Sequence, residues 1–287
     1  MDKPPFTPRI SRDEGFGKKR FFLVAGLLPV VLGAIIWLAI PRNEPVYQGK
    51  RLSAWLYQSV ANETIHYQNP PPNHQSEEAS RARANADAET AIKHIGTNAL
   101  PYLLKMAAVK DSPLKERLIS LWYKQSLVSL PFRSAGDFHR MAIAGFASLR
   151  SDAAPAVPGL IKLLYISSTT REGDMAQDAG NCLSFIGPAS VPGLLPLATN
   201  KNPAVEFFAT GALDTIAPRL AYLLGTDENE TNRRRYAFEL AEIGSGDSHV
   251  TNALANALTD KSLLVRRAAT NALIIFKKRY HARWSNP

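Results

Sequence analysis

The chain has 287 residues, of which 45% are hydrophobic and 21% charged, and this composition excludes wholesale disorder. Its single cysteine, Cys182, excludes an intramolecular disulfide framework and a cysteine-rich metal site. The formal net charge of +9 is unevenly placed: residues 1–20 carry six basic and three acidic side chains, residues 41–232 are neutral, and residues 233–287 carry ten basic and four acidic side chains. Because the basicity belongs to the two ends, the sequence does not indicate a surface that coats nucleic acid along its length.

Residues 1–20 are predicted to form a basic tail, and residues 21–40 a transmembrane anchor. The second stretch contains no charged residue, and as a helix it would rise about 30 Å, which matches the hydrocarbon core of a bilayer. Trp37 lies near its far end, where an indole suits the membrane interface. A cleaved signal peptide is the alternative, but cleavage after Ala39 would put Trp37 at a position that requires a small residue.

The charges beside the apolar stretch predict its orientation. Lys18, Lys19 and Arg20 directly precede it, and the positive-inside rule keeps such a flank in the cytoplasm. We therefore expect a single-pass membrane protein with a cytoplasmic N-terminus. The larger C-terminal part is then extracytoplasmic, and periplasmic if the organism is a bacterium.

Residues 41–80 are predicted to contain a cap helix followed by a proline-rich loop. Leu52, Trp55, Leu56 and Val60 fall on one helical face, and a helical solenoid needs an atypical cover at its open end. The loop is indicated by three consecutive prolines at positions 70–72.

Residues 81–287 repeat an apolar reference position that defines six units. The reference residues are Ile95, Leu149, Ile186, Ile216, Ile243 and Phe276. Each has an apolar residue three positions earlier, and in the first three units a proline follows six positions later, where it suits the first turn of a new helix. The pattern predicts a helix, a short turn and a second helix in each unit. The wide gap after the first unit predicts an inserted helical segment near residues 107–137.

In the fifth and sixth units an aspartate precedes an arginine by six residues, as Asp227 with Arg233 and Asp260 with Arg266. This frame resembles the HEAT-repeat family, and the short units are similar to its phycobilisome-lyase-type subgroup. The resemblance covers roughly residues 80–280. It implies an all-α fold, a right-handed α-solenoid of about six HEAT-like helix pairs that follows one transmembrane helix. The layout is also similar to bacterial membrane-anchored HEAT-repeat proteins, a resemblance that brings no assigned activity.

No motif in the sequence indicates a catalytic or cofactor site. The six histidines lack metal-ligand spacing, and no glycine-rich loop follows a predicted strand. Cys182 lies on an inner helix stripe, where a buried structural thiol is expected. We therefore expect a non-enzymatic protein with no cofactor, no bound metal and no small-molecule substrate.

The candidate binding residues are the basic surplus at the C-terminal end. Arg233 and Arg266 occupy structural places of the repeat, and Arg235 is expected to form a solvated ion pair with Glu239. The remaining cations are candidates for binding an anionic partner: Arg234, Arg267, Lys277, Lys278 and Arg279. They could meet an acidic protein, lipid headgroups or nucleic acid, or they could only solubilise a terminal cap.

These observations favour a membrane-anchored scaffold that binds another protein. A HEAT-like nucleic-acid-binding protein or DNA-glycosylase-like enzyme is a second hypothesis, which the neutral middle of the chain and the expected extracytoplasmic placement disfavour. A lyase-type HEAT protein, or a chaperone of such a lyase, is a third hypothesis that no catalytic residue in the sequence supports.

Overall fold

The computed structural model describes residues 44–61, 74–112, 133–170, 172–245 and 247–284. The chain divides into two compact units, residues 1–44 and 45–287, and the helices described below belong to the second. The predicted tail (1–20) and transmembrane anchor (21–40) lie outside the described residues, as does most of the predicted insertion near 107–137. Within the described ranges, every helix is too short or too polar to cross a bilayer.

The described chain opens with a hairpin and a cap helix. Strands β1 (Val46–Tyr47) and β2 (Lys50–Arg51) pair antiparallel, and helix α2 (Leu52–Ala61) follows. Leu52, Trp55 and Leu56 of α2 are buried, which confirms the predicted apolar face. The hairpin was not predicted, because strands of two residues leave no alternating pattern in a sequence.

The first unit consists of α3 (His74–Ile95), the 3-10 turn η1 (Gly96–Ala99) and α4 (Leu100–Ala107). Helix α3 begins inside the stretch that we expected to be loop up to residue 80. Its first turns are rich in glutamate, serine and alanine, which the proline-based prediction of a loop did not weigh. The turn and second helix of the unit match the prediction.

The second and third units are also helix pairs. They comprise α6 (Ala135–Leu149), η2 (Arg150–Ala156), α7 (Val157–Thr169), α8 (Gly173–Ile186), η3 (Pro188–Ser190), α9 (Val191–Leu194) and η4 (Leu197–Thr199). Pro192 lies in the first turn of α9, as predicted, whereas Pro155 lies near the end of η2, two residues before α7 begins.

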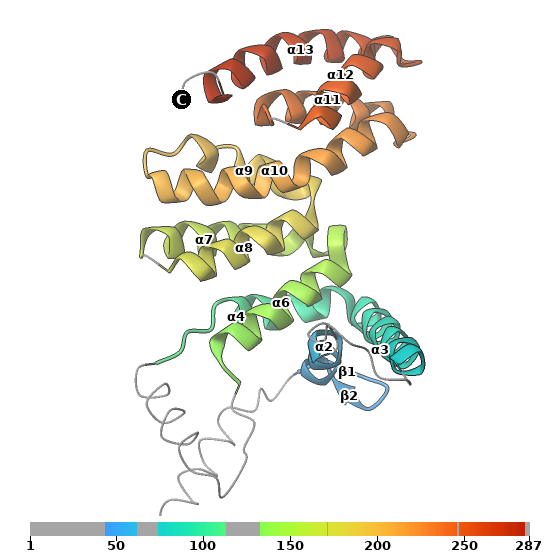
Figure 1. The fold of residues 1–287 in the computed structure, drawn as a ribbon, viewed down its shortest axis with the longest axis vertical. Coiled ribbons are helices and arrows are strands. Elements are labelled where there is room, and N and C mark those ends of the chain that lie inside the picture. Colours follow the sequence, from blue (N-terminus) through green and yellow to red (C-terminus); the bar gives the residue numbers. More distant parts are fainter. Residues whose placement is uncertain (1–43, 62–73, 113–132, 171, 246, 285–287) are drawn as a thin grey trace, which may run out of the picture. The chain divides into compact units, whose positions relative to one another are not determined.

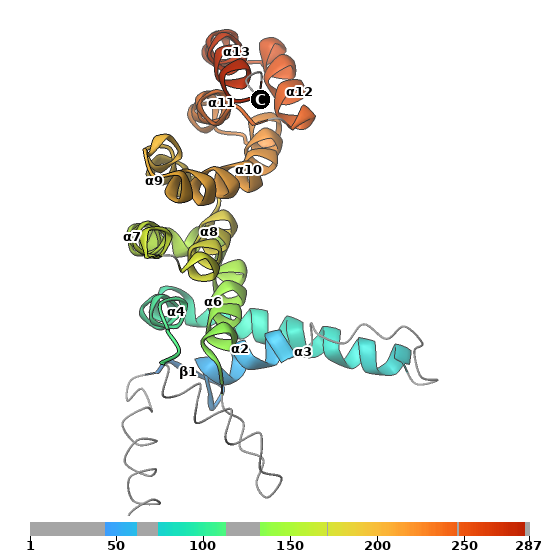
Figure 2. The ribbon, with the colours of Figure 1, turned by 60° about the vertical axis from the view of Figure 1, so that its left-hand side comes forward.

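The fourth unit departs from the predicted pair of helices. It forms one helix of 24 residues, α10 (Pro203–Thr226), which runs through Pro218. Proline contributes no N–H to the helical hydrogen bonds, and inside a helix it either kinks the helix or ends it. Figures 1 and 2 show that α10 changes direction along its length.

The last two units are α11 (Glu230–Ile243), α12 (Ser248–Asn256), η5 (Ala257–Thr259) and α13 (Leu263–Trp284). Asn229 and Asp247 cap the N-termini of α11 and α12 with side-chain oxygens. In the described residues the sixth unit is therefore one helix rather than a pair.

The helices stack in chain order, as Figure 1 shows. Helix α6 packs on α4 and α8, α8 on α10, α10 on α11, and α11 on α13. All six reference residues are buried, as are their small neighbours such as Ala179 and Ala269. The predicted repeat register is thus confirmed, and the described part of the chain is an almost entirely helical stack. Its superhelical hand stays a prediction.

Candidate functional site

Arg233 is the centre of a polar tie between the fifth and sixth units. Its side chain is only 3% exposed. The Nε and Nη2 atoms donate to Asp260 Oδ2 and Oδ1 at 2.8 and 2.9 Å. The Nη1 atom donates to the backbone carbonyls of Asp227 and Glu228 at 2.8 and 2.9 Å. All three guanidinium nitrogens donate hydrogen bonds and the side chain is buried, so Arg233 has a structural role.

The carboxylate that Arg233 binds belongs to the next unit and not to its own. The carboxylate of Asp227 instead accepts hydrogen bonds from the Asn229 backbone, Asn232 Nδ2 and the Tyr236 hydroxyl, at 2.8 to 3.2 Å. The hydrogen bond from the Asn229 backbone N–H is the largest of the effects that lower the pKa of Asp227. The Arg233 guanidinium lowers the pKa of Asp260. The Asp–Arg frame thus links successive units. The six-residue spacing within one unit does not reveal that the arginine pairs with the aspartate of the next unit.

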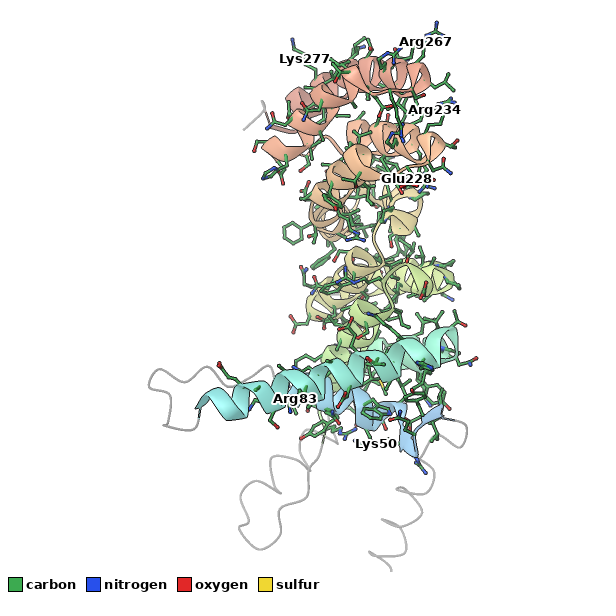
Figure 3. The ribbon with its side chains drawn as sticks, turned by 90° about the vertical axis from the view of Figure 1, so that its right-hand side faces the viewer. Lys50, Arg83, Glu228, Arg234, Arg267 and Lys277 are labelled. Atoms are coloured by element: carbon green, nitrogen blue, oxygen red, sulfur yellow. The ribbon has the colours of Figure 1, made fainter. Side chains whose placement is uncertain are left out.

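Four of the five candidate cations are exposed: Arg234, Arg267, Lys277 and Lys278. The side chain of the fifth, Arg279, lies outside what the structure describes. Figure 3 shows Arg234 and Arg267 one above the other on the same side of the stack, with Lys277 at the other end of α13. The structure therefore brings Arg234 and Arg267 together and separates Lys277 from them.

Glu239 differs from the prediction of a solvated ion pair. It is only 8% exposed, and its Oε1 lies 3.4 Å from Arg235 Nε. Burial raises the pKa of Glu239 to about 7. The position four residues before the reference residue holds only small side chains in the other units: Ala91, Gly145, Cys182, Ala212 and Ala272. Sequence reasoning missed the burial, although that comparison of positions carried the signal.

His139 is a second buried ionisable group that sequence reasoning missed. It is 7% exposed, with Nδ1 3.0 Å from Asp178 Oδ2 and Nε2 2.9 Å from the Val109 carbonyl. Because both ring nitrogens face acceptors, the protonated imidazolium satisfies both contacts. The hydrogen bond to Asp178 raises the pKa of His139. The ring has no open side for a substrate, so this contact is structural.

A groove lies between the second half of α10 and α12. Its volume is about 570 Å³, and its lining includes Tyr222, His249, Asn252 and Asn256. These groups offer hydrogen bonds and an aromatic face.

Burial raises the pKa of the Cys182 thiol, which is fully enclosed elsewhere in the stack. Within the described residues, no cluster of His, Cys, Asp or Glu side chains could hold a metal ion.

Comparisons with known proteins assign no family. No protein-family model matches the chain, and no curated protein matches it. Among solved structures, crystal structures of engineered proteins from the Northeast Structural Genomics Consortium match weakly. The first is 21% identical, with 79% of this chain and 90% of that chain covered and a TM-score of 0.30. The second is 19% identical, with 77% and 98% covered and a TM-score of 0.27. TM-scores this low do not establish a shared fold, so the architecture rests on the helix contacts described above.

Proposed function

We propose that the chain is a HEAT-like scaffold that binds an anionic protein through Arg234 and Arg267. We further propose that residues 21–40 anchor it in a membrane, with the helical stack on the extracytoplasmic side. The observation that carries the proposal is the placement of these two exposed arginines one repeat apart on one side of the stack (Figure 3). This proposal makes the protein a non-enzymatic binding module.

The Asp–Arg frame supports this role because it fixes the backbone from which the two arginines project. Arg234 and Arg267 directly follow Arg233 and Arg266, whose side chains are bound to the backbone of their own units. Neither exposed arginine forms a hydrogen bond or ion pair with the described residues. Two guanidinium groups at a fixed spacing suit two carboxylates, because each can bind one in a bidentate manner.

Charge distribution favours an acidic protein over nucleic acid. A phosphate backbone is bound by many cations along a continuous track. Residues 41–232 are neutral overall, and Lys277 lies away from the arginine pair (Figure 3). Two exposed arginines one repeat apart match a local group of carboxylates better than the long phosphate backbone of a nucleic acid.

The test is the double variant Arg234→Glu, Arg267→Glu. A matched control, Lys50→Glu with Arg83→Glu, makes the same charge change at the other end of the stack (Figure 3). We expect the first variant to bind a 20-residue poly-glutamate peptide with a Kd at least about tenfold higher than that of the wild type. It should also fail to retain the proteins that the wild type retains from solubilised membranes. The control should keep both.

Two results would contradict the proposal. Equal losses of binding in both double variants would mean that binding depends only on the net charge of the chain. Tighter binding of duplex DNA than of the peptide at 150 mM salt would favour the nucleic-acid alternative. The anchor is tested separately, since the full chain should stay in membranes through alkaline carbonate extraction.

A further inference from the structure

Arg266 repeats only half of the contacts that Arg233 makes. Its Nη1 donates to the backbone carbonyls of Asp260 and Lys261 at 2.7 and 3.2 Å, as Arg233 Nη1 does one unit earlier. The Nε and Nη2 atoms of Arg233 bind the carboxylate of Asp260. The same two atoms of Arg266 have no partner among the described residues. The guanidinium of Arg266 is therefore held in place with its carboxylate-binding edge open.

The helix face around Arg266 is also uncovered. On α11, which packs on α13, Ala237 and Ala241 stand one and two turns after Arg233 and are fully buried. Their counterparts on α13, 33 residues later, are Thr270 and Ile274. Thr270 is exposed, and Ile274 is 57% exposed. The positions that are buried on α11 are therefore exposed on α13, within the part of the chain that the structure describes.

We call this surface the outer face of α13; it consists of Leu263, Arg266, Thr270, Ile274 and Lys277, which recur at helical spacing. Leu263 is 51% exposed, one turn before Arg266. The face thus combines two apolar side chains with two cations. Helix α13 contains no acidic residue.

We propose that the outer face of α13 docks a helix of an acidic partner protein, with an aspartate at the start of that helix seated on Arg266. The inference rests on the proposed function, whose partner class it refines. The docked aspartate takes the place that Asp260 takes on Arg233, three residues before the first residue of α13. A carboxylate there accepts from Nε and Nη2 in parallel, in the geometry that arginine favours.

The charges of the outer face select this occupant. A second copy that presented its own α13 would bring arginine and lysine against arginine and lysine. An uncharged helix would cover Ile274 and Leu263 but leave the open edge of Arg266 without an acceptor. An acidic amphipathic helix satisfies both the apolar and the charged parts of the face.

Arg267 lies beside the docked helix and not beneath it. Its counterpart Arg234 stays exposed although α13 packs on α11. Arg267 therefore stays available for the contact proposed for it above, while the aspartate of the docked helix binds Arg266.

The experiment uses the full chain and two synthetic helical peptides of 20 residues, each closed by a side-chain lactam. One peptide begins Asp-Lys-Ser, as residues 260–262 do, and carries glutamates beside a leucine stripe; the other has asparagine in place of that aspartate. We expect the wild type to prefer the aspartate peptide by about tenfold in Kd. Arg266→Lys should abolish that preference, because lysine can keep a contact to the Asp260 carbonyl but cannot bind bidentately. Arg219→Lys, at an exposed arginine of α10 that lies outside both proposed contacts, should keep it.

The inference is overturned if the aspartate peptide does not bind up to millimolar concentration, or if Arg266→Lys retains the tenfold preference. Thermal melting of Arg266→Lys checks that the variant is folded. The double variant Arg234→Glu, Arg267→Glu distinguishes the two proposals. Loss of the poly-glutamate peptide in that variant supports the proposed function, whereas the aspartate preference reports only on Arg266.

Discussion

The second and fifth units are tied to their successors by the same arrangement made from different residues. His139 and Arg233 both stand ten positions before the reference residue of their unit. His139 binds one backbone carbonyl and the Asp178 carboxylate of the next unit. Arg233 binds two backbone carbonyls and, with two nitrogens, the Asp260 carboxylate of the next unit. Arginine stays protonated at every ordinary pH, whereas histidine titrates near neutrality. One tie is therefore permanent and the other depends on pH.

The third and fourth units show that the tie is not needed everywhere. The same position holds Ala176 in the third unit and Glu206 in the fourth. Those units rely on close apolar packing, as at Gly180 of α8, where an added Cβ would lie 3.7 Å from the Ala212 Cβ of α10. Apolar packing thus joins all the units of the stack, and the polar contacts add to it only at particular units.

The largest expected effect tests the apolar packing that joins the units. Leu183→Ala and Leu240→Ala remove fully buried side chains from the third and fifth units. Each should lower the free energy of unfolding by about 2–5 kcal/mol, through lost burial and a cavity. Urea denaturation measures both. Leu258→Ala, at a partly exposed position, should cost less than about 0.5 kcal/mol; a comparable cost there would mean that burial does not set these values.

The permanent tie is tested by Arg233→Ala. Loss of the guanidinium leaves the Asp260 carboxylate partly buried without its donor, which should cost about 3 kcal/mol. The cost should be constant from pH 5 to 9, because the lowered pKa of Asp260 keeps the pair ionised and the stabilisation is lost only in acid below about pH 4. Arg234→Ala is the neighbouring control and should change stability little. If the stability cost of Arg233→Ala varied strongly with pH across the neutral range, the Arg233 contact would not differ from the His139 contact in its pH dependence.

Glu239 should give the fifth unit a pH dependence of its own. Its pKa is raised to about 7 in the folded chain, so folding favours the protonated form and stability falls as pH rises from about 4.5 to 7. Glu239→Gln should therefore stabilise the protein above pH 7 by on the order of 2 kcal/mol and change little at pH 4. Thermal melting across this range measures the difference. An equal effect at both pH values would point to packing rather than charge.

The smallest expected effect belongs to the titratable tie. The pKa of His139 is raised, so the stabilisation from its tie is complete below about pH 6.5 and is lost as pH rises through the folded-state pKa. His139→Gln should cost about 1 kcal/mol at pH 5.5 and less at pH 9. Melting at the two pH values measures this. A variant whose cost is the same at both would show that the ring contributes shape and not charge.

The repeat register could be predicted from the sequence because it rests on local spacing. The inner positions of a helix recur every three or four residues, and Leu183, Ile186, Leu240 and Ile243 are all buried as predicted. The ties could not be predicted in the same way. The partner of Arg233 is 27 residues away, and the pairing of Arg235 with Glu239 looks the same in sequence whether the carboxylate is buried or solvated.

The continuity of α10 has a consequence for cooperativity. In a linear array each repeat contacts only its neighbours, so distant repeats can open independently. Helix α10 contacts α8 near Phe208 and Ala212, and its residues from Pro218 onward line the groove with α12. One continuous helix, which lacks only the backbone hydrogen bond that Pro218 cannot donate, therefore belongs to both neighbours. Amide protons on either side of Pro218 should exchange with solvent through a shared opening event, which makes the middle of the stack a single cooperative block.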